Sequence, residues 1–527
     1  MIVNFWIIWD RVASGFFCRP FGANRFSVLG LFVCVFCQLG WLMVMMIASF
    51  AQRSLTACAY RSPARKGPLA LSASLLAMAL ASASPFGACA VQAETMSGAL
   101  AKSYGYSPDL NQQRAATRAA DEGVPRATAG WRPTLNATTS IGVATTKTVD
   151  RGVVKLSSDT VPRVTGVTLT QTLYNGGRVG NGVRQAESTV LQSRETLRQS
   201  EQDILAAAAT AYMNVLRDTA LLELQTNNVN VLQQQLKQTE DRFKAGEVTR
   251  TDVAQSEASL ARGQADAFQA RSDLQNSTAV YRQVIGEQPR NLEPARPVEA
   301  LLPASLEAAL TLALKEHPRI QAALHAVDVA ALNVTIQEGA LLPTVTATGT
   351  ATVNREPTGY ANYQNKSWSA VASLSVPLYE GGATYSAIRQ AKEQLGQSRI
   401  QVDLQRETIR SAVVAAWGGF QTTKLTIQSF QAQVRANEIA LEGVREEAKV
   451  GQRTTIDVLN AQQTLLNSRV SLVTAQRTQV VTSYTLLAAV GKLSAASLGL
   501  RVATYHPEAH FDQVKGKWIG TRTPDGN

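Results

Sequence analysis

Histidine and cysteine, the side chains that most often bind metals or act as nucleophiles, are few in this chain of 527 residues. All five cysteines lie within residues 1–93, and the four histidines are His317, His325, His506 and His510. No acidic or cysteine partner stands at metal-ligand spacing from these histidines. No phosphate-binding loop or nucleophile motif occurs either. We therefore expect no cofactor, no metal and no enzymatic activity, so that any energy must come from a partner.

The side chains with the most regular placement are two aspartates that follow paired glycines. The segment Lys244-Ala-Gly-Glu-Val-Thr-Arg-Thr-Asp-Val253 aligns with Lys449-Val-Gly-Gln-Arg-Thr-Thr-Ile-Asp-Val458 at an offset of 205 residues. In each segment the glycine suits a left-handed residue that ends a helix. The aspartate, together with either of two nearby threonines (Thr249 or Thr251, Thr454 or Thr455), can cap the next helix. Both segments are predicted to be the tips of helical hairpins.

The paired tips belong to an internal duplication. Leu173-Tyr-Asn-Gly-Gly matches Leu378-Tyr-Glu-Gly-Gly at the same offset of 205, whereas Pro133-Thr-Leu-Asn-Ala-Thr matches Pro343-Thr-Val-Thr-Ala-Thr at 210. The difference of five residues must lie between Pro133 and Leu173, where we expect a surface loop between two strands. The predicted organisation is a leader followed by two repeats and a tail. The boundaries are 1–93, 94–290, 291–491 and 492–527.

Each repeat contains two segments in which polar and apolar residues alternate, as on a β-strand. Alternate positions over 343–353 and 368–378 form one apolar face and one face of Thr or Ser, and 135–143 and 167–173 alternate similarly. Their lengths suit tilted membrane strands. Trp131, Tyr174, Trp368 and Tyr379 are expected at strand ends, as interfacial aromatics. A soluble β-sandwich is the alternative, but four strands separated by long helices make one hard to build.

Long helices are predicted to follow the strand-helix junctions at Gly176, Gly177, Gly381 and Gly382. The segments 177–246 and 382–451 contain no proline, and about 65 helical residues extend about 100 Å. Return helices are expected over 249–285 and 454–490. One shorter helix should lead into each strand pair, over about 97–130 and 305–341. A leading helix and a return helix, stacked end to end, would match the height of the long one.

The leader has the features of an export signal. Arg61, Arg65 and Lys66 precede the apolar run 69–83, and Val91-Gln92-Ala93 is a small-residue cleavage site. Upstream, 26–50 is long enough to span a bilayer. This segment is either a real anchor or, as we favour, an extension before the true start codon. Lipidation at Cys89 is a weaker alternative, because Phe86 fits that motif poorly.

The net charge gives no indication of nucleic-acid binding. The formal charge is +11, but residues 1–93 hold seven basic residues and one acidic residue, so the remainder carries +5. No basic cluster follows residue 93. The remainder also lacks an apolar run near 18 residues, so it could cross a membrane only as a closed barrel.

Taken together, these motifs resemble the TolC-type outer-membrane efflux family. The resemblance rests on the paired Leu-Tyr-x-Gly-Gly strand ends, the paired Gly-x-x-Thr-x-x-Asp-Val tips, the duplication and Leu-Pro-Thr-Val at Leu342, and it covers about Met96 to Gly491. The segment from Tyr505 to Gly520 is similar to the type I secretion branch. The implied fold is mainly α with a membrane β-barrel: a homotrimeric, 12-stranded outer-membrane barrel, Thr/Ser faces inward, continuous with a periplasmic α-helical coiled-coil barrel.

The resemblance also implies a gate at the periplasmic end, held closed by polar links between neighbouring helices. The matching positions are Thr251, Asp252, Arg453, Asp457 and Asn460. Arg453 would donate to Thr251 or Asp252, and a threefold ring of Asp457 would select cations. Asn460 replaces an acidic residue of the family and Ala448 an aromatic one, so the latch would differ. The alternative is that both aspartates serve only as helix caps. A capping role does not conflict with a role in the gate.

The implied function is a passive exit duct serving a tripartite export system, with outer-membrane lipid around its barrel. A periplasmic adaptor (membrane fusion protein), coupled to an inner-membrane transporter, would dock at the tips. The docking positions are Ala245, Gly246, Glu247, Val450, Gly451 and Gln452. Type I protein secretion is the favoured role, and multidrug efflux is the alternative. A third possibility, that the chain is itself an adaptor, fits less well because an adaptor has one helical hairpin and not two.

Overall fold

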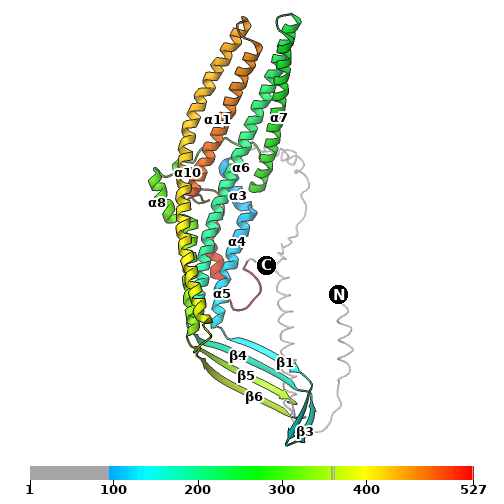
Figure 1. Cartoon of the computed structure of the whole chain (residues 1–527), viewed down its shortest axis with the longest axis vertical. Helices are drawn as coiled ribbons and strands as arrows, with labels where there is room; N and C mark the ends of the chain where they lie inside the picture. The colour runs from blue at the N-terminus through cyan, green and yellow to red at the C-terminus, as the bar shows by residue number, and fades with distance from the viewer. Residues whose placement is uncertain (1–93, 358–359, 361, 525, 527) are drawn as a thin grey trace, which may run out of the picture. The chain divides into compact units, whose positions relative to one another are not determined.

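A computed structural model describes residues 94–357, 360, 362–524 and 526. The predicted signal peptide, the upstream segment and Cys89 therefore lie outside the described residues. Within the described part, α-helices dominate, and the strands lie together beyond one end of the helices (Figure 1). No helix of the described part has the combined length and apolar character that a membrane crossing requires.

The first half of the described chain runs from short helices through strands into a long helical hairpin. Its elements are α3 (Met96–Tyr106), α4 (Pro108–Asp121), α5 (Gly123–Thr128), η1 (Ala129–Trp131), β1 (Thr134–Ile141), β2 (Ala144–Asp150), β3 (Val153–Thr160), β4 (Arg163–Asn175), α6 (Arg178–Lys244) and α7 (Arg250–Ile285).

The second half has the same overall order, from short helices through two strands into a long helical hairpin, and adds a short terminal helix. Its elements are η2 (Glu299–Leu301), α8 (Leu306–Glu316), α9 (Pro318–Glu338), η3 (Gly339–Leu341), β5 (Thr344–Arg355), β6 (Gln364–Ser375), α10 (Ala383–Lys449), α11 (Thr455–Ala489) and α12 (Pro507–Val514). The predicted long helices are confirmed, since α6 and α10 each have 67 residues. The predicted return helices are confirmed as α7 and α11.

The prediction of one leading helix per repeat is wrong, because each is broken at a proline. Pro108 and Pro318 lack the N–H that would continue the preceding helix, and each begins a new one. The residue before each proline caps the new helix: the Ser107 hydroxyl accepts from the Leu110 N–H, and His317 Nδ1 accepts from the Arg319 N–H at 3.2 Å. The first leading segment therefore consists of α3, α4 and α5.

The predicted surface loop of the first repeat is also more ordered than expected. The segment between β1 and β4 forms the antiparallel pair β2–β3, which is a separate two-stranded sheet. Arg151 and Gly152 turn the chain between these strands, both with positive φ. The extra residues of the first repeat thus pair with one another instead of forming an irregular loop.

The four remaining strands form one antiparallel sheet in the order β1-β4-β5-β6. Its register aligns the predicted faces: Leu135 lies opposite Leu169, which lies opposite Gly349, whereas Thr168 lies opposite Thr350, whose hydroxyl contacts that of Ser369 at 2.7 Å. The predicted alternation is therefore confirmed across the sheet. One detail is wrong: Trp368 lies within β6, opposite Ala351, and not at a strand end.

The sheet is not closed by the residues that the structure describes. Its edge strands β1 and β6 have no neighbour on their outer sides in the described part, and every residue of both strands is exposed. Large apolar side chains are open to solvent, including Leu135 (69% exposed) and Trp368 (85% exposed). Such edges and apolar faces require a covering partner.

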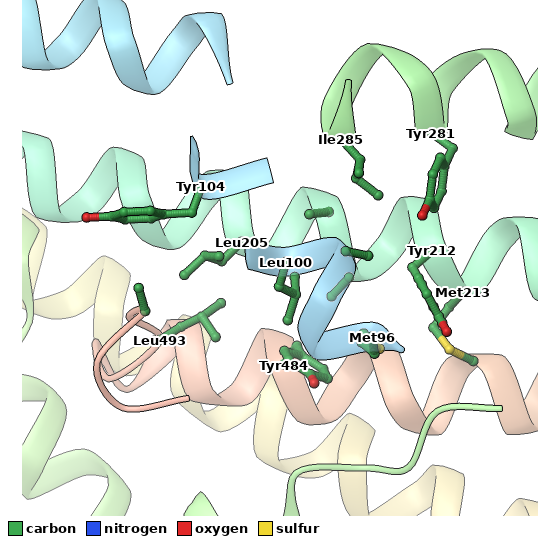
Figure 2. Packing of buried hydrophobic residues seen from close by; sticks show 14 of the residues in the cluster. Met96, Leu100, Tyr104, Leu205, Tyr212, Met213, Tyr281, Ile285, Tyr484 and Leu493 are labelled. Carbon is green, nitrogen blue, oxygen red and sulfur yellow. The ribbon is translucent and has the colours of Figure 1, made fainter. Parts of the chain in front are cut away.

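The core lies where α7 and α11 end and the short helices begin. Figure 2 shows Met96 and Leu100 of α3 against Leu205 and Tyr212 of α6, with Tyr281 of α7 nearby. A second cluster joins α8 and α9 to α10 and the end of α11. Burying these apolar side chains is the main favourable contribution to the fold. The two clusters thus pack the shorter helices against the long helices at the level where a return helix ends and a leading helix begins.

Tyr212 joins the segment before α3 to the segment after α7. Its buried hydroxyl lies 2.7 Å from the carbonyl oxygens of Glu94 and Glu293, and Glu293 N–H also donates to the Glu94 carbonyl at 3.1 Å.

We expect Tyr212→Phe to destabilise the protein by about 1–2 kcal/mol, because a buried hydrogen bond is lost. Thermal unfolding in detergent would measure this. Tyr385→Phe, at a tyrosine that is 52% exposed on α10, should change nothing, and equal effects of the two variants would refute the assignment.

His317 makes the stability depend on pH. Its side chain is 2% exposed, and burial lowers its pKa to about 4. The unfolded chain takes up this proton near pH 6.5 and the folded chain only near pH 4, so stability is lost as the pH falls through this range. We expect the loss attributable to His317 at pH 5 to be on the order of 2 kcal/mol.

The test compares the unfolding midpoint at pH 7 and at pH 5. His317→Asn retains a capping oxygen but has no group that titrates in this range, so its midpoint should fall less between the two pH values. His506→Asn, at an exposed histidine, is the matched control and should keep the original pH dependence. A full pH dependence in His317→Asn would contradict the interpretation.

Candidate functional site: hairpin tips and strand–helix junctions

The four glycines predicted at the strand–helix junctions lie there with left-handed backbones. Gly176 and Gly177 have φ of 67° and 75°, and Gly381 and Gly382 have φ of 64° and 85°. A Cβ at Gly176 would lie 2.2 Å from the carbonyl oxygen of Gly339, so only glycine fits that contact. A Cβ at Gly381 would meet nothing within 4 Å. The first junction is therefore covered within the chain, whereas the second is open.

The tips have the predicted geometry. Gly246 and Gly451 have φ of 81° and 79°, and the next residue of each tip donates back to the helix, Glu247 to Arg242 O and Gln452 to Glu447 O, at 2.9 Å in both cases. These are Schellman turns, which satisfy the last carbonyls of α6 and α10. The docking positions Ala245, Gly246, Glu247, Val450, Gly451 and Gln452 are all exposed.

Each predicted aspartate takes part in capping the helix that follows its tip. Of the two candidate threonines at each tip, the capping residues are Thr249 and Thr454. The backbone N–H and hydroxyl of Thr249 donate to Asp252 Oδ2 at 2.8 and 2.7 Å. Thr454 contacts Asp457 Oδ2 in the same way at 3.0 and 2.8 Å. These hydrogen bonds lower the pKa of both carboxyls. Both aspartates therefore carry negative charge at neutral pH.

Within this chain, Arg453 binds a different partner from the one predicted. Its Nε donates to Glu447 Oε2 at 2.8 Å across the tip, and this contact raises the pKa of Arg453. The single chain does not bring Arg453 together with Thr251 or Asp252. Thr251 and Asn460 are exposed, and the predicted link from Arg453 stays a prediction. Glu447 was not among the predicted site residues, and it lies six residues before Arg453 on the other side of the turn.

The two hairpins contact each other below the tips and separate toward them (Figure 1). Arg477 Nε of α11 donates to Asn214 Oδ1 of α6 at 2.9 Å. Farther toward the tips, Gln462 Nε2 contacts Asn228 Oδ1 at 3.5 Å. A cavity of about 280 Å³ at this level is lined by α6, α10 and α11. The tip residues of the two hairpins are therefore free to pair with other chains.

Two of the four histidines, His317 and His510, take structural roles. His317 caps α9, and His510 Nδ1 of α12 lies 2.9 Å from Asp121 Oδ2 of α4. Burial raises the pKa of Asp121. Among the described residues, no group of three or more His, Cys, Asp or Glu side chains is placed to hold a metal ion.

Two long helical hairpins attached to an antiparallel sheet with one apolar face are the architecture of an outer-membrane channel protein. Residues 100–287 and 309–492 match the family described as outer membrane efflux protein. The outer membrane efflux protein BepC of Brucella suis biovar 1 (strain 1330) is 40% identical over 437 residues, which cover 83% of this chain and 94% of BepC. The chain therefore belongs to the outer membrane efflux protein family, of the TolC type.

Two further relatives extend this comparison. The alkaline protease secretion protein AprF of Pseudomonas aeruginosa is 28% identical over 373 residues, 68% of this chain and 76% of AprF. The crystal structure of the CmeC outer membrane channel of Campylobacter jejuni matches with a TM-score of 0.68 at 15% identity, over 80% of this chain and 89% of that chain. The fold is thus that of TolC-type channels, and the protein lies in the outer membrane with its helices extending into the periplasm.

The tip turn can be tested with one glycine of the turn, Gly451, and one glycine of the preceding helix α10, Gly443. Gly451→Ala places a side chain at positive φ and should cost about 1 kcal/mol locally. Gly443→Ala lies in the regular part of α10 with open space around its Cβ and should be neutral or slightly stabilising. Hydrogen exchange read by mass spectrometry should show the ends of α10 and α11 exchanging about fivefold faster in Gly451→Ala only. Faster exchange in both variants would contradict this reading.

Proposed function

We propose that the protein is one subunit of a homotrimeric exit duct for a tripartite export system. The observation that carries this proposal is a sheet with one exposed apolar face and two edges that no described strand pairs, joined directly to two 67-residue helices. In lipid, unpaired strand edges are not tolerated, so the sheet must close with other copies. Three copies give twelve strands, and the open junction at Gly381 offers a surface for the next copy.

In this assembly the repeats 94–290 and 291–491 would alternate around the axis, with the tail 492–527 attached to the helical part. The Thr/Ser face of the sheet would line the lumen and the apolar face would contact lipid. The helical hairpins would form the periplasmic tunnel. A periplasmic adaptor, coupled to an inner-membrane transporter, would dock on the exposed tips at 245–247 and 450–452.

The gate would lie at these tips. In the closed state Arg453 of one hairpin would pair with Thr251 or Asp252 of a neighbouring hairpin, and in the open state it would return to Glu447, its partner within the single chain. Asp457 would form a threefold acidic ring, with Asn460 next to it. Both aspartates would then cap helices and also set the charge of the pore.

The role that we favour for this duct is the export of proteins by a type I secretion system. AprF, whose name gives alkaline protease secretion as its role, supports this choice. BepC, which is more similar in sequence and is named for efflux, supports the alternative of small-molecule efflux. A wide duct selects by size and charge, so the same tip gate serves either cargo.

Single-channel conductance in a planar bilayer tests the duct and its gate. We expect small, cation-selective currents from the unaltered protein, a several-fold larger conductance in Arg453→Ala, and reduced cation selectivity in Asp457→Asn. Asparagine is used because it keeps an oxygen that can cap α11 while it removes the charge.

Asp273→Asn, at an exposed aspartate of α7 far from the tips, is the matched control and should leave selectivity unchanged. A protein that remains monomeric in detergent or never inserts would overturn the trimeric duct. Insertion with unchanged conductance in Arg453→Ala would overturn only the gate.

A further inference from the structure

The C-terminal tail returns to the level at which the helices meet the sheet. Its helix α12 packs on α4, where the pair His510–Asp121 is almost fully buried. Beyond α12 the chain reaches Arg132, which stands two residues before β1. Arg132 Nη1 donates to the carbonyl oxygen of Lys517 at 2.6 Å, and its guanidinium lies 4.6 Å from the ring centroid of Trp518.

This contact builds one wall of a groove of about 520 Å³ between the tail and α5. Four basic side chains line the groove, namely those of Arg126, Arg132, Lys517 and Arg522, against one acidic side chain, that of Glu122. Arg126 and Arg522 are exposed and form no ion pair with the described part of the chain. The groove therefore has a net positive charge that the described residues do not neutralise, and anions are attracted to such a surface.

Two apolar side chains next to the groove are left uncovered. Trp518 is 68% exposed and Ile519 is 94% exposed. Exposed tryptophan beside arginine and lysine is typical of the boundary between lipid and water, where the ring enters the headgroup region and the cations contact phosphates. The positions agree with this, because β1 begins at Thr134 and its second residue, Leu135, is 69% exposed on the apolar face.

We propose that the groove formed by Arg126, Arg132 and residues 517–522 binds the headgroup of an anionic phospholipid in the periplasmic leaflet. Trp518 and Ile519 insert among the lipids beside it, and the groove continues the lipid-facing surface of the sheet. Arginine suits this task because it has five N–H donors in a planar fork, so Arg132 can hold the tail and still donate to a phosphate. The proposal rests on the orientation given under Proposed function, with the helices in the periplasm.

Quenching of tryptophan fluorescence by brominated lipid tests this site in the full-length protein. The protein is reconstituted in phosphatidylcholine bilayers that contain equal fractions of brominated phosphatidylglycerol or of brominated phosphatidylcholine. The signal of Trp518 is the difference between the unaltered protein and Trp518→Phe. We expect phosphatidylglycerol to quench this signal at least about twofold more strongly than phosphatidylcholine, because each nearby cation enriches anionic lipid.

The double variant Arg126→Gln/Arg522→Gln should lower quenching by phosphatidylglycerol to the level of phosphatidylcholine. The double variant Arg262→Gln/Arg271→Gln removes two exposed arginines of α7 and should keep the twofold difference. Equal quenching by both lipids in the unaltered protein would overturn the headgroup site. Quenching by neither lipid would also overturn it and would indicate that another copy of the chain covers Trp518. Channel currents are recorded from the same preparation. Currents without preferential quenching by phosphatidylglycerol would overturn the lipid site alone, whereas absence of currents would indicate that the duct itself has failed.

Discussion

The main physical constraint on this fold is the match in length between a continuous helix and the shorter helices stacked end to end beside it. A 67-residue helix such as α6 extends about 100 Å, and in proteins most of the stability of a helix comes from packing its apolar face against other elements. Each long helix therefore needs partners over its whole length. The return helix covers one part and the broken leading segment covers the other. The core lies at the level where these two meet, around Tyr212 and Tyr281.

This arrangement explains why polar contacts occur at the break between stacked helices. Gln202 Nε2 donates to the carbonyl oxygen of Gly491 at 2.8 Å, just after α11 ends, and Tyr212 contacts the carbonyls of Glu94 and Glu293. Helix ends leave backbone groups without partners, and side chains of the continuous helix satisfy some of them. The long helices thus contribute hydrogen bonds as well as apolar surface at this level.

The two ends of the molecule differ in what they leave open. At the tips, the Schellman turns and capping aspartates satisfy the backbone locally, so the hairpins can separate without exposing unpaired groups. At the sheet, the outer edges of β1 and β6 have no partner strand among the residues that the structure describes, and in lipid such edges must be covered. The first end could therefore change its partners, as the proposed gate would require, whereas the second end would need permanent closure in the proposed duct. The tail connects the helical part to the second end through Arg132 and Trp518.

From the sequence alone one can predict the duplicated order of elements, the two long helices, the tips with their glycines and aspartates, and the two faces of the strands. These features depend on local periodicity and on residues with special backbone preferences, such as Gly246 and Gly451. The break at Pro108 and Pro318, the β2–β3 pair, the contact of Arg453 with Glu447, and the place of the tail are seen only in the folded chain. Each of these depends on which chain segment lies nearby in space. For the same reason, one sequence could not show that Gly176 is covered within the chain while Gly381 is open, since the two glycines stand in the same local motif.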